Sequence, residues 1–369
     1  MAILAYRLPI MTMVMLAIKN TGVSALLAAA CMFVGLYMLA LPCSAVEPVF
    51  RPDGIPAKQF SSDHAKTGGP KQYYLSIYSG STSGVYYYVA SALCETLRAR
   101  YEEHHIHCSP LRSQGAGSNR GLMNQGRAQF AIVQSDTNYY AATGEVPMPG
   151  ARSVASLHDE MGVLVMSKRT KIAKPQDLKH KRINLGLKES SAHILWVEYL
   201  DSLGLTEKEM EKAVNFAQDI NYQGICDNYI DAFGLWSGHP VPALTDAIER
   251  CGLTLAGMWH PAIGTLLEKH KYYFRNELPA KVYPGQNEPL VSYGIKASLI
   301  AHEKADPYIV YWLTRVIIEN IDFLRTQHPT LTHLNARDMF ALSNFLPMHE
   351  GAARYWREIG WLPKGASLH

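Results

Sequence analysis

A strand that ends in a loop of small polar residues and continues as an amphipathic helix restricts the fold of this chain more than any other feature. The strand is expected at Tyr74–Tyr78, the loop at 79–84 (SGSTSG), and the helix from Val85, with apolar residues at helical spacing as far as Leu97. Such a loop offers unpaired backbone N–H groups, hydroxyls and the positive end of a helix dipole. It is therefore expected to bind a carboxylate or a phosphate, although similar turns also join strands to helices without any ligand.

A second strand ends in polar side chains a short distance further along the chain. The strand is expected at Phe130–Val133, and it is followed by Gln134, Ser135 and Asp136. Ligands of open α/β sheets bind outside the carboxyl ends of the strands. The two strand ends therefore predict one anion-binding cleft. No G-x-S-x-G elbow or comparable catalytic signature is present, so we expect capture of a small acid and not an enzyme.

The first 45 residues have the pattern of a secretory signal peptide. They carry Arg7 and Lys19 but no acid, an apolar run over 23–41, and a small-residue site at Cys43-Ser44-Ala45. Two alternatives remain open, namely acylation of Cys43, which the preceding proline fits poorly, and retention of the apolar run as a membrane anchor. Residues 46–70 are rich in proline, glycine and serine and are expected to form a flexible leader.

The charge and the cysteines of the exported chain narrow its class further. The formal net charge is +3, and removal of the two signal-peptide cations leaves about +1, so we expect no nucleic-acid partner. Four cysteines remain, and an oxidising compartment favours disulfides with three possible pairings. Sequence proximity favours Cys94 with Cys108 and Cys226 with Cys251. The spacings contain no CxxC, so neither a metal site nor a cofactor is expected.

Strands and helices alternate through the rest of the chain, which predicts an α/β fold with mostly parallel sheets and flanking helices. Further strands are expected at 162–166, 182–187, 231–236, 253–258 and 290–300. Residues 260–288 look irregular, and one long amphipathic helix is expected at 305–326. The return to a strand after a compact middle section predicts a discontinuous lobe I (71–159 and 289–369) and an inserted lobe II (160–288).

Six segments in a fixed order give the chain a family resemblance. They are GSTSGVYYY (80–88), AIVQSD (131–136), PQDLKHKRINLG (175–186), IDAFGLWSGHP (230–240), YPGQN (283–287) and LPMHEGAARYWREIGW (346–361). Over about residues 72–363 the chain resembles the TAXI-type solute receptors of tripartite ATP-independent periplasmic (TRAP) transporters. The resemblance implies a monomeric, periplasmic, type II-like clamshell. It would deliver a glutamate-like amino acid or a dicarboxylate to a TRAP membrane subunit. A sensory role, in which the clamshell reports its ligand to a membrane signalling partner, is the alternative.

The same resemblance implies a set of ligand contacts from both lobes. They are Ser81, Thr82, Gly84, Val85, Tyr86, Gln134, Asp136, Ser190, Ser191, Ser237 and Tyr283. Two segments depart from the family pattern. Asn119-Arg120-Gly121 replaces a usual Glu-Asn pair and could place Arg120 near an acidic ligand, and Lys188–Ala192 replaces a Gly-Ser-Gly-Thr loop. The ligand therefore cannot be copied from relatives. Trp236 is the one tryptophan that a strand end could bring to the ligand.

Overall fold

The computed structural model describes residues 70–170, 172, 174–188, 190–342 and 344–366. The signal peptide and nearly all of the leader predicted above lie outside the described residues. Within those residues, no helix combines the length and apolar character needed to cross a membrane.

The strands form one mixed sheet in the order β2-β1-β3-β10-β4-β7-β5-β6, with β8 paired to β4 and β9 to β10. Their bounds are β1 Tyr73–Tyr78, β2 Ile106–Leu111, β3 Phe130–Gln134, β4 Ala151–Ser167, β5 Arg182–Asn184, β6 Lys212–Val214, β7 Ala232–Ser237, β8 Leu253–Gly257, β9 Phe274–Leu278 and β10 Leu290–His302.

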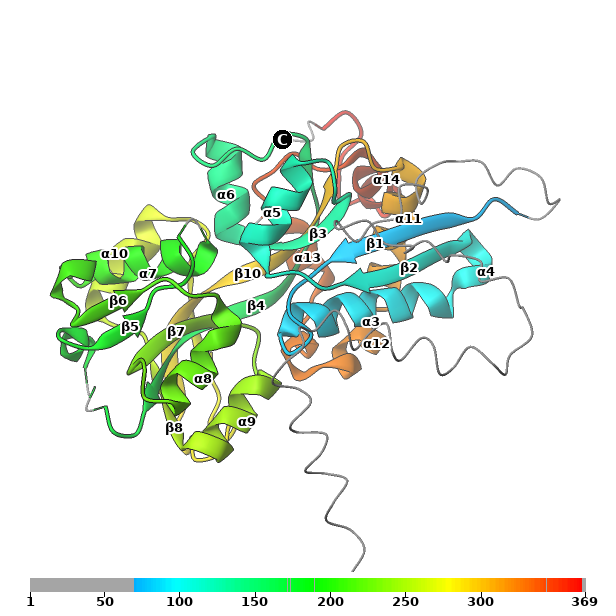
Figure 1. Cartoon of the computed structure of the whole chain (residues 1–369). Coiled ribbons are helices and arrows are strands. Elements are labelled where there is room, and N and C mark those ends of the chain that lie inside the picture. Colours follow the sequence, from blue (N-terminus) through cyan, green and yellow to red (C-terminus); the bar gives the residue numbers. More distant parts are fainter. Residues whose placement is uncertain (1–69, 171, 173, 189, 343, 367–369) are drawn as a thin grey trace, which may run out of the picture. The chain divides into compact units, whose positions relative to one another are not determined.

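Helices flank this sheet (Figure 1). Their bounds are α3 Val85–Ala99, α4 Tyr101–His104, α5 Ala116–Asn124, α6 Ser135–Thr143, α7 Ser191–Ser202, α8 Asn221–Cys226, α9 Pro242–Cys251, α10 Pro261–Lys269, α11 Pro307–Glu319, α12 Ile321–Gln327, α13 Ala336–Ala341 and α14 Glu350–Glu358. The predicted α/β fold is thereby confirmed.

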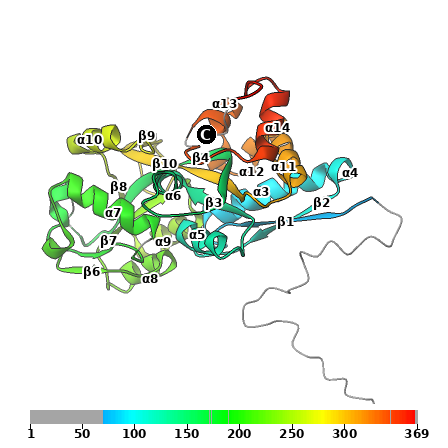
Figure 2. The same cartoon turned by 90° about the horizontal axis from the view of Figure 1, so that it is seen from above.

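Two long antiparallel strands connect two groups of strands. Figures 1 and 2 show β4 and β10 side by side, and their ladder runs from the pair His302–Ala151 to the pair Gly294–Met161. Group I (β1, β2 and β3) joins this ladder through β3 and the second half of β10. Group II (β5 to β9) joins it through the second half of β4 and the first half of β10.

The sheet is mixed, which corrects the prediction of mostly parallel sheets. The β1–β2, β1–β3, β5–β6 and β5–β7 pairs are parallel, but every pair that includes β4 or β10 is antiparallel. Alternation of strands and helices along the chain indicates parallel neighbours only when consecutive strands are linked by crossover helices. Here the two long strands are inserted between neighbours that run in the opposite direction.

Several predicted bounds also differ from the structure. The segment 260–288 is not irregular, because it contains α10 and β9. The helix expected at 305–326 is broken at Asn320, which separates α11 from α12. The strand expected from residue 162 begins at Ala151, and β2 was not expected at all. In β2, Pro110 argues against a strand, because proline has no N–H to donate to a neighbouring strand.

The core has two parts, and the larger one contains residues of both strand groups, such as Ile77 of β1 and Phe233 of β7. The larger part contains the helix face expected at the start of α3, since Val85, Val89, Leu93 and Leu97 are all buried. The smaller part lies under group II and is rich in aromatic rings, including Trp196, Trp236, Tyr199, Tyr272 and Tyr293. Trp196 and Trp236 form an edge-to-face pair with ring centroids 6.1 Å apart. Such pairs stabilise a core by more than the burial of their apolar area alone.

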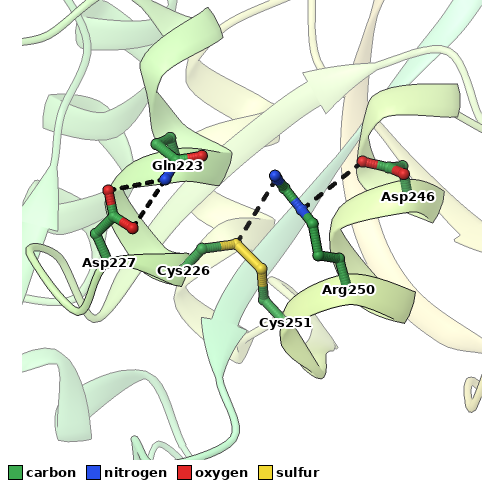
Figure 3. Close-up of a disulfide and its surroundings, with 6 residues drawn as sticks. All are labelled: Gln223, Cys226, Asp227, Asp246, Arg250 and Cys251. Carbon is green, nitrogen blue, oxygen red and sulfur yellow. Dashed lines mark hydrogen bonds and ion pairs between the residues drawn. A yellow bond between two sulfur atoms is a disulfide. The ribbon is translucent and has the colours of Figure 1, made fainter. Parts of the chain in front are cut away.

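Both predicted disulfides are present. Cys94 is bonded to Cys108, which ties α3 to β2, and their Cα atoms are 5.0 Å apart. Cys226 is bonded to Cys251 with a Cα separation of 5.4 Å, and this bond joins the ends of α8 and α9 (Figure 3). Neither bond connects group I to group II. The pairing by sequence proximity is thus confirmed.

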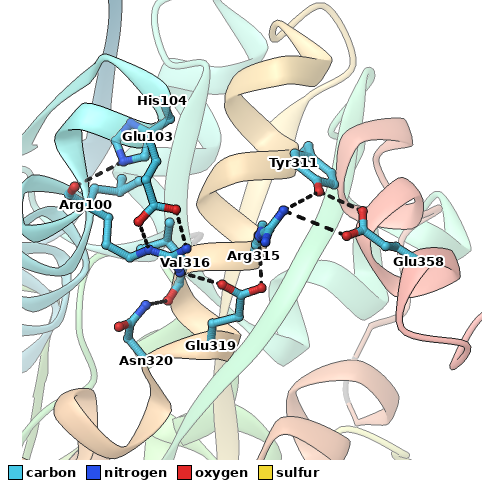
Figure 4. Close-up of polar contacts among 10 residues, drawn as sticks. Arg100, Glu103, His104, Tyr311, Arg315, Val316, Glu319, Asn320 and Glu358 are labelled. Atoms are coloured by element: carbon cyan, nitrogen blue, oxygen red, sulfur yellow. Dashed lines mark hydrogen bonds and ion pairs between the residues drawn. The ribbon is translucent and has the colours of Figure 1, made fainter.

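A polar network holds the end of α3 against the C-terminal helices (Figure 4). Arg100 pairs with Glu103 and reaches Glu319 of α11 at 2.5 Å. Arg315 pairs with the same Glu319 at 2.9 Å, and it faces Glu358 of α14 at 3.8 Å. Single exposed ion pairs add little stability. Here shared partners link three segments that are distant in sequence.

Candidate ligand-binding site

A cavity of about 270 Å³ lies where elements of the two strand groups face each other. At roughly 30 Å³ for each water molecule, the cavity has room for about nine waters, and hence for a small solute. Group I contributes the loops after β1 and β2 and the end of β3, and the long strand β4 contributes Glu160. Group II contributes residues that follow β5, β6 and β7.

The N-terminal ends of several helices line this cavity, including the short helix α8 (Asn221 and Tyr222) and four longer ones. The four longer helices are α3 (Gly84, Val85 and Tyr86), α5 (115–117), α7 (190–192) and α9 (Val241). The first N–H groups of a helix have no partner inside the helix, and the helix dipole places partial positive charge there. No side chain caps α3 or α5. Their N–H groups are therefore available to an anion in the cavity.

The loop before α3 has the internal structure of a tight turn. The Gly84 N–H donates to the Ser81 carbonyl at 2.9 Å, and the hydroxyls of Ser81 and Ser83 are 2.9 Å apart. Thr82 is exposed at the outside of this turn. The turn therefore directs Ser81 and Ser83, and not Thr82, to the cavity.

The loop before α5 forms the neighbouring part of the wall. Ser113 donates its hydroxyl to the Ser79 carbonyl at 3.1 Å and accepts the Gly115 N–H at 3.0 Å, so the loops after β1 and β2 are joined. Gly115 has a φ of +92°, which a residue with a Cβ rarely adopts. This conformation turns the chain directly into α5.

Glu160 is the buried acid of the cavity. It lies on β4 at 1 % exposure and accepts a hydrogen bond from Gln134 Nε2. Burial raises its pKa to about 8, the Gln134 hydrogen bond and the neighbouring Tyr86 hydroxyl oppose that shift, and the charge of Asp136 adds to it. The Tyr86 hydroxyl is itself buried and lies close enough to Glu160 for each to shift the pKa of the other. Both side chains line the cavity.

Group II supplies a wall of amides, hydroxyls and indoles. Asn184 is the last residue of β5, and its side-chain amide donates a hydrogen bond to Oδ1 of Asn221 at the start of α8. Both residues line the cavity. Ser190 caps α7 by accepting the His193 N–H at 3.2 Å. Trp196 and Trp236 close the apolar part of the wall. Among the described residues that line the cavity, only Arg112 and Glu160 have a charge-bearing acidic or basic side chain.

The structure brings most, but not all, of the predicted contacts together. Those that line the cavity are Ser81, Gly84, Val85, Tyr86, Gln134, Ser190, Ser191 and Ser237. Thr82, Asp136 and Tyr283 do not line it. Trp236 does, as the end of its strand suggested. Arg120 lies instead at a separate, much smaller cavity with Thr137 and Tyr140.

Asp136 and Tyr283 act behind the wall. Asp136 is fully buried, and burial raises its pKa to about 6, while hydrogen bonding to Ser191 opposes the shift. The Tyr283 hydroxyl accepts the Val241 N–H at 2.8 Å and lies 2.6 Å from His239 Nδ1. It therefore fixes the start of α9 and does not face the cavity. A turn motif in the sequence cannot distinguish a ligand contact from the support of a neighbouring helix.

Sequence reasoning missed three parts of the wall. The segment 112–117 was missed because β2 was not recognised, so its loop was not counted as a strand end. Asn184 ends the short strand β5, which was expected to continue to residue 187. The position of Glu160 in the cavity could have been inferred from the sequence. Glu160 adjoins Asp159, and since successive side chains of a strand point to opposite faces, one of two consecutive acids must point inward.

Comparisons with known proteins place the chain in a family. The model of the NMT1-like family matches residues 77–360, and the chain belongs to that family. Solved structures of binding proteins are similar at low identity. The periplasmic aliphatic sulphonate-binding protein SsuA of Escherichia coli is 13 % identical with a TM-score of 0.42, over 81 % of this chain and 96 % of that one.

PhnD1 of Prochlorococcus marinus, solved with methylphosphonate, is 12 % identical with a TM-score of 0.49, over 79 % of this chain and all of that one. The alkanesulfonate-binding protein SsuA of Xanthomonas axonopodis pv. citri, bound to MOPS, is 12 % identical with a TM-score of 0.44. That alignment covers 82 % of this chain and 98 % of that one. Likeness at this level carries no information about the ligand of this chain.

Proposed function

We propose that this member of the NMT1-like family is an exported solute receptor that captures a small organic anion or an amino acid between two lobes. The observation that carries the proposal is the convergence of the N-termini of α3, α5, α7 and α9, three of them without a side-chain cap, on one cavity of about 270 Å³. Partial positive charge from several helices suits a carboxylate, a sulfonate or a phosphonate without requiring a buried cation. No nucleophile with an adjacent base is part of this proposal, and the bound solute leaves unchanged.

Closure around the solute would use the two long strands as the hinge. Because β4 and β10 run through both strand groups, a change in their twist near Met161 and Gly294 would move group II relative to group I. A contact between helices that flank the two strand groups is already present in this structure. Thr137 of α6 and Ser191 of α7 have hydroxyl oxygens 3.0 Å apart. We propose the lobe boundaries at 159/160 and 288/289 on this basis.

Delivery to the membrane subunit of a TRAP transporter is the finer part of the proposal, and the ordered motifs of the sequence support it. A periplasmic location follows from the same resemblance and from the signal-like first 45 residues. The organisation of the neighbouring genes tests delivery directly. A gene for a large tripartite membrane subunit beside this one is the expected result, whereas genes for an ATP-driven permease in its place would contradict it.

Ligand capture is tested by thermal unfolding of the mature chain after removal of any bound solute by unfolding and refolding. The panel contains amino acids, dicarboxylates, sulfonates, phosphonates, sugars and divalent metal ions. At a solute concentration of about a hundred times the dissociation constant, the matching acid should stabilise the protein by about 2.7 kcal/mol. Stabilisation by a sugar or a metal ion, with no acid effective, would rule the proposal out.

A further inference from the structure

The ionisable groups around Glu160 leave its carboxyl without a counter-charge. Its own strand provides His158, whose Nε2 is 3.7 Å from Glu160 Oε1 and whose pKa burial lowers to about 3, so the ring is neutral. From α3 comes the neutral Tyr86, and from α6 comes the acid Asp136. Lys296 of β10 is paired with Asp159 on the other face of β4.

Arg112 is the one basic side chain among the described residues that line the cavity, and it does not pair with Glu160. It is exposed at the end of β2, whereas Glu160 is 1 % exposed. A buried carboxyl is stable only when it is paired, hydrogen-bonded or protonated. In the empty cavity Glu160 has the Gln134 hydrogen bond and is protonated near neutral pH. The buried acid can therefore pair with a positive group, and none of the described residues around it supplies one.

The cavity is therefore electrically divided. The α3 and α5 ends of the wall present N–H groups to an anion, while Glu160, with the acid Asp136 behind it, presents a carboxyl that becomes negative when it loses its proton. An acid with a second carboxylate at Glu160 would place like charges together in a buried site. A solute that carries both an anionic group and a protonated amine satisfies both parts.

We infer that Glu160 is the specificity-determining residue of this pocket and that it binds a protonated amine of the solute. The pocket then takes a zwitterionic amino acid, aminosulfonate or aminophosphonate in preference to the same acid without the amine. This inference rests on the proposed function, since it concerns the solute of the same cavity.

Binding of such a solute should release a proton. Near pH 7 the empty pocket holds Glu160 protonated, because its pKa is raised to about 8 by burial. An adjacent ammonium group favours the carboxylate, so the carboxyl O–H bond breaks and the proton passes to the buffer while the solute keeps its own. Affinity for the amine-bearing solute should accordingly rise with pH up to about 8.

Titration calorimetry on the stripped mature protein tests the inference with matched pairs of solutes. The pairs are glutamate and glutarate, alanine and propionate, taurine and ethanesulfonate, and 2-aminoethylphosphonate and ethylphosphonate. In the pair whose anion fits, the amine-bearing member should bind about thirtyfold more tightly or better. Titrations in phosphate and in Tris at pH 7 should show release of close to one proton for each solute bound.

Two variants separate the role of Glu160 from general effects of charge. Glu160→Gln keeps the shape of the side chain and should abolish both the amine preference and the proton release. Asp159→Asn removes the neighbouring acid, which lies outside the cavity lining, and should preserve both. The wild-type proton count stands as a measurement that does not depend on the folding of either variant.

The possible failures are distinct. Equal affinity within the matching pair, proton uptake, or an amine preference that survives Glu160→Gln would overturn the inference and leave the receptor intact. Tight binding of an acid without an amine would do the same. If no acid of either kind binds, the proposed function and this inference both fail.

Discussion

Tyr283→Phe removes a single oxygen atom and is expected to cost about 2–6 kcal/mol of unfolding free energy. His239 Nε2 is 3.0 Å from the Met161 carbonyl, so this nitrogen carries the ring proton, and Nδ1 is an acceptor. The Tyr283 hydroxyl donates to that Nδ1 and accepts the N–H of Val241. The substitution therefore leaves one buried donor and one buried acceptor without partners, at about 1–3 kcal/mol each.

Urea unfolding of the solute-free protein measures this loss. Tyr229→Phe is the matched control, because Tyr229 is 44 % exposed and its hydroxyl bonds Lys212 at the surface. The control should change the unfolding free energy by less than about 0.5 kcal/mol. If Tyr283→Phe is no more costly than the control but abolishes solute binding, then Tyr283 contacts the solute, and our reading of its supporting role is wrong.

The other expectations concern Glu160 and the disulfides. The pKa of Glu160 is raised above its ordinary value of 4.5 to about 8, so its stabilising contribution is complete below pH 4.5 and is lost as the pH rises through 8. The empty Glu160→Gln protein should therefore gain several kcal/mol on the wild type between pH 5 and 8 in urea unfolding, and parallel pH curves would contradict this. Serine at both Cys226 and Cys251 should cost about 3 kcal/mol. Peptide mapping without reduction should recover this pair and the Cys94–Cys108 pair, and free thiols or cross-links between the pairs would refute the assignment.

The part of the site that could be predicted from the sequence is the part built by consecutive residues. The strand, turn and helix from β1 to α3 need only local rules, namely apolar alternation, a small-residue turn and helical spacing. The same is true of Ser190, whose hydroxyl and position mark the start of α7. The disulfides followed from proximity, since each bond joins neighbouring elements.

Other features were decided by contacts between segments far apart in the chain. Whether Ser83 or Thr82 enters the cavity depends on how the turn sits against α5, and Tyr283 is turned toward α9 by its bonds to His239 and Val241. The sequence could not specify these choices. Ser83 and Thr82 are chemically alike and adjacent, and the orientation of Tyr283 depends on residues that are distant in sequence.

The sequence by itself indicated the α/β class, the turn between β1 and α3 and the disulfide pairing, because these arise from residues that are close along the chain. Only the tertiary structure decided that β4 and β10 run antiparallel through both strand groups. That ladder pairs residues more than 130 positions apart and places Glu160 in the same cavity as the helix N-termini. The energy of such pairing depends on packing and burial across the whole sheet, which local patterns do not encode.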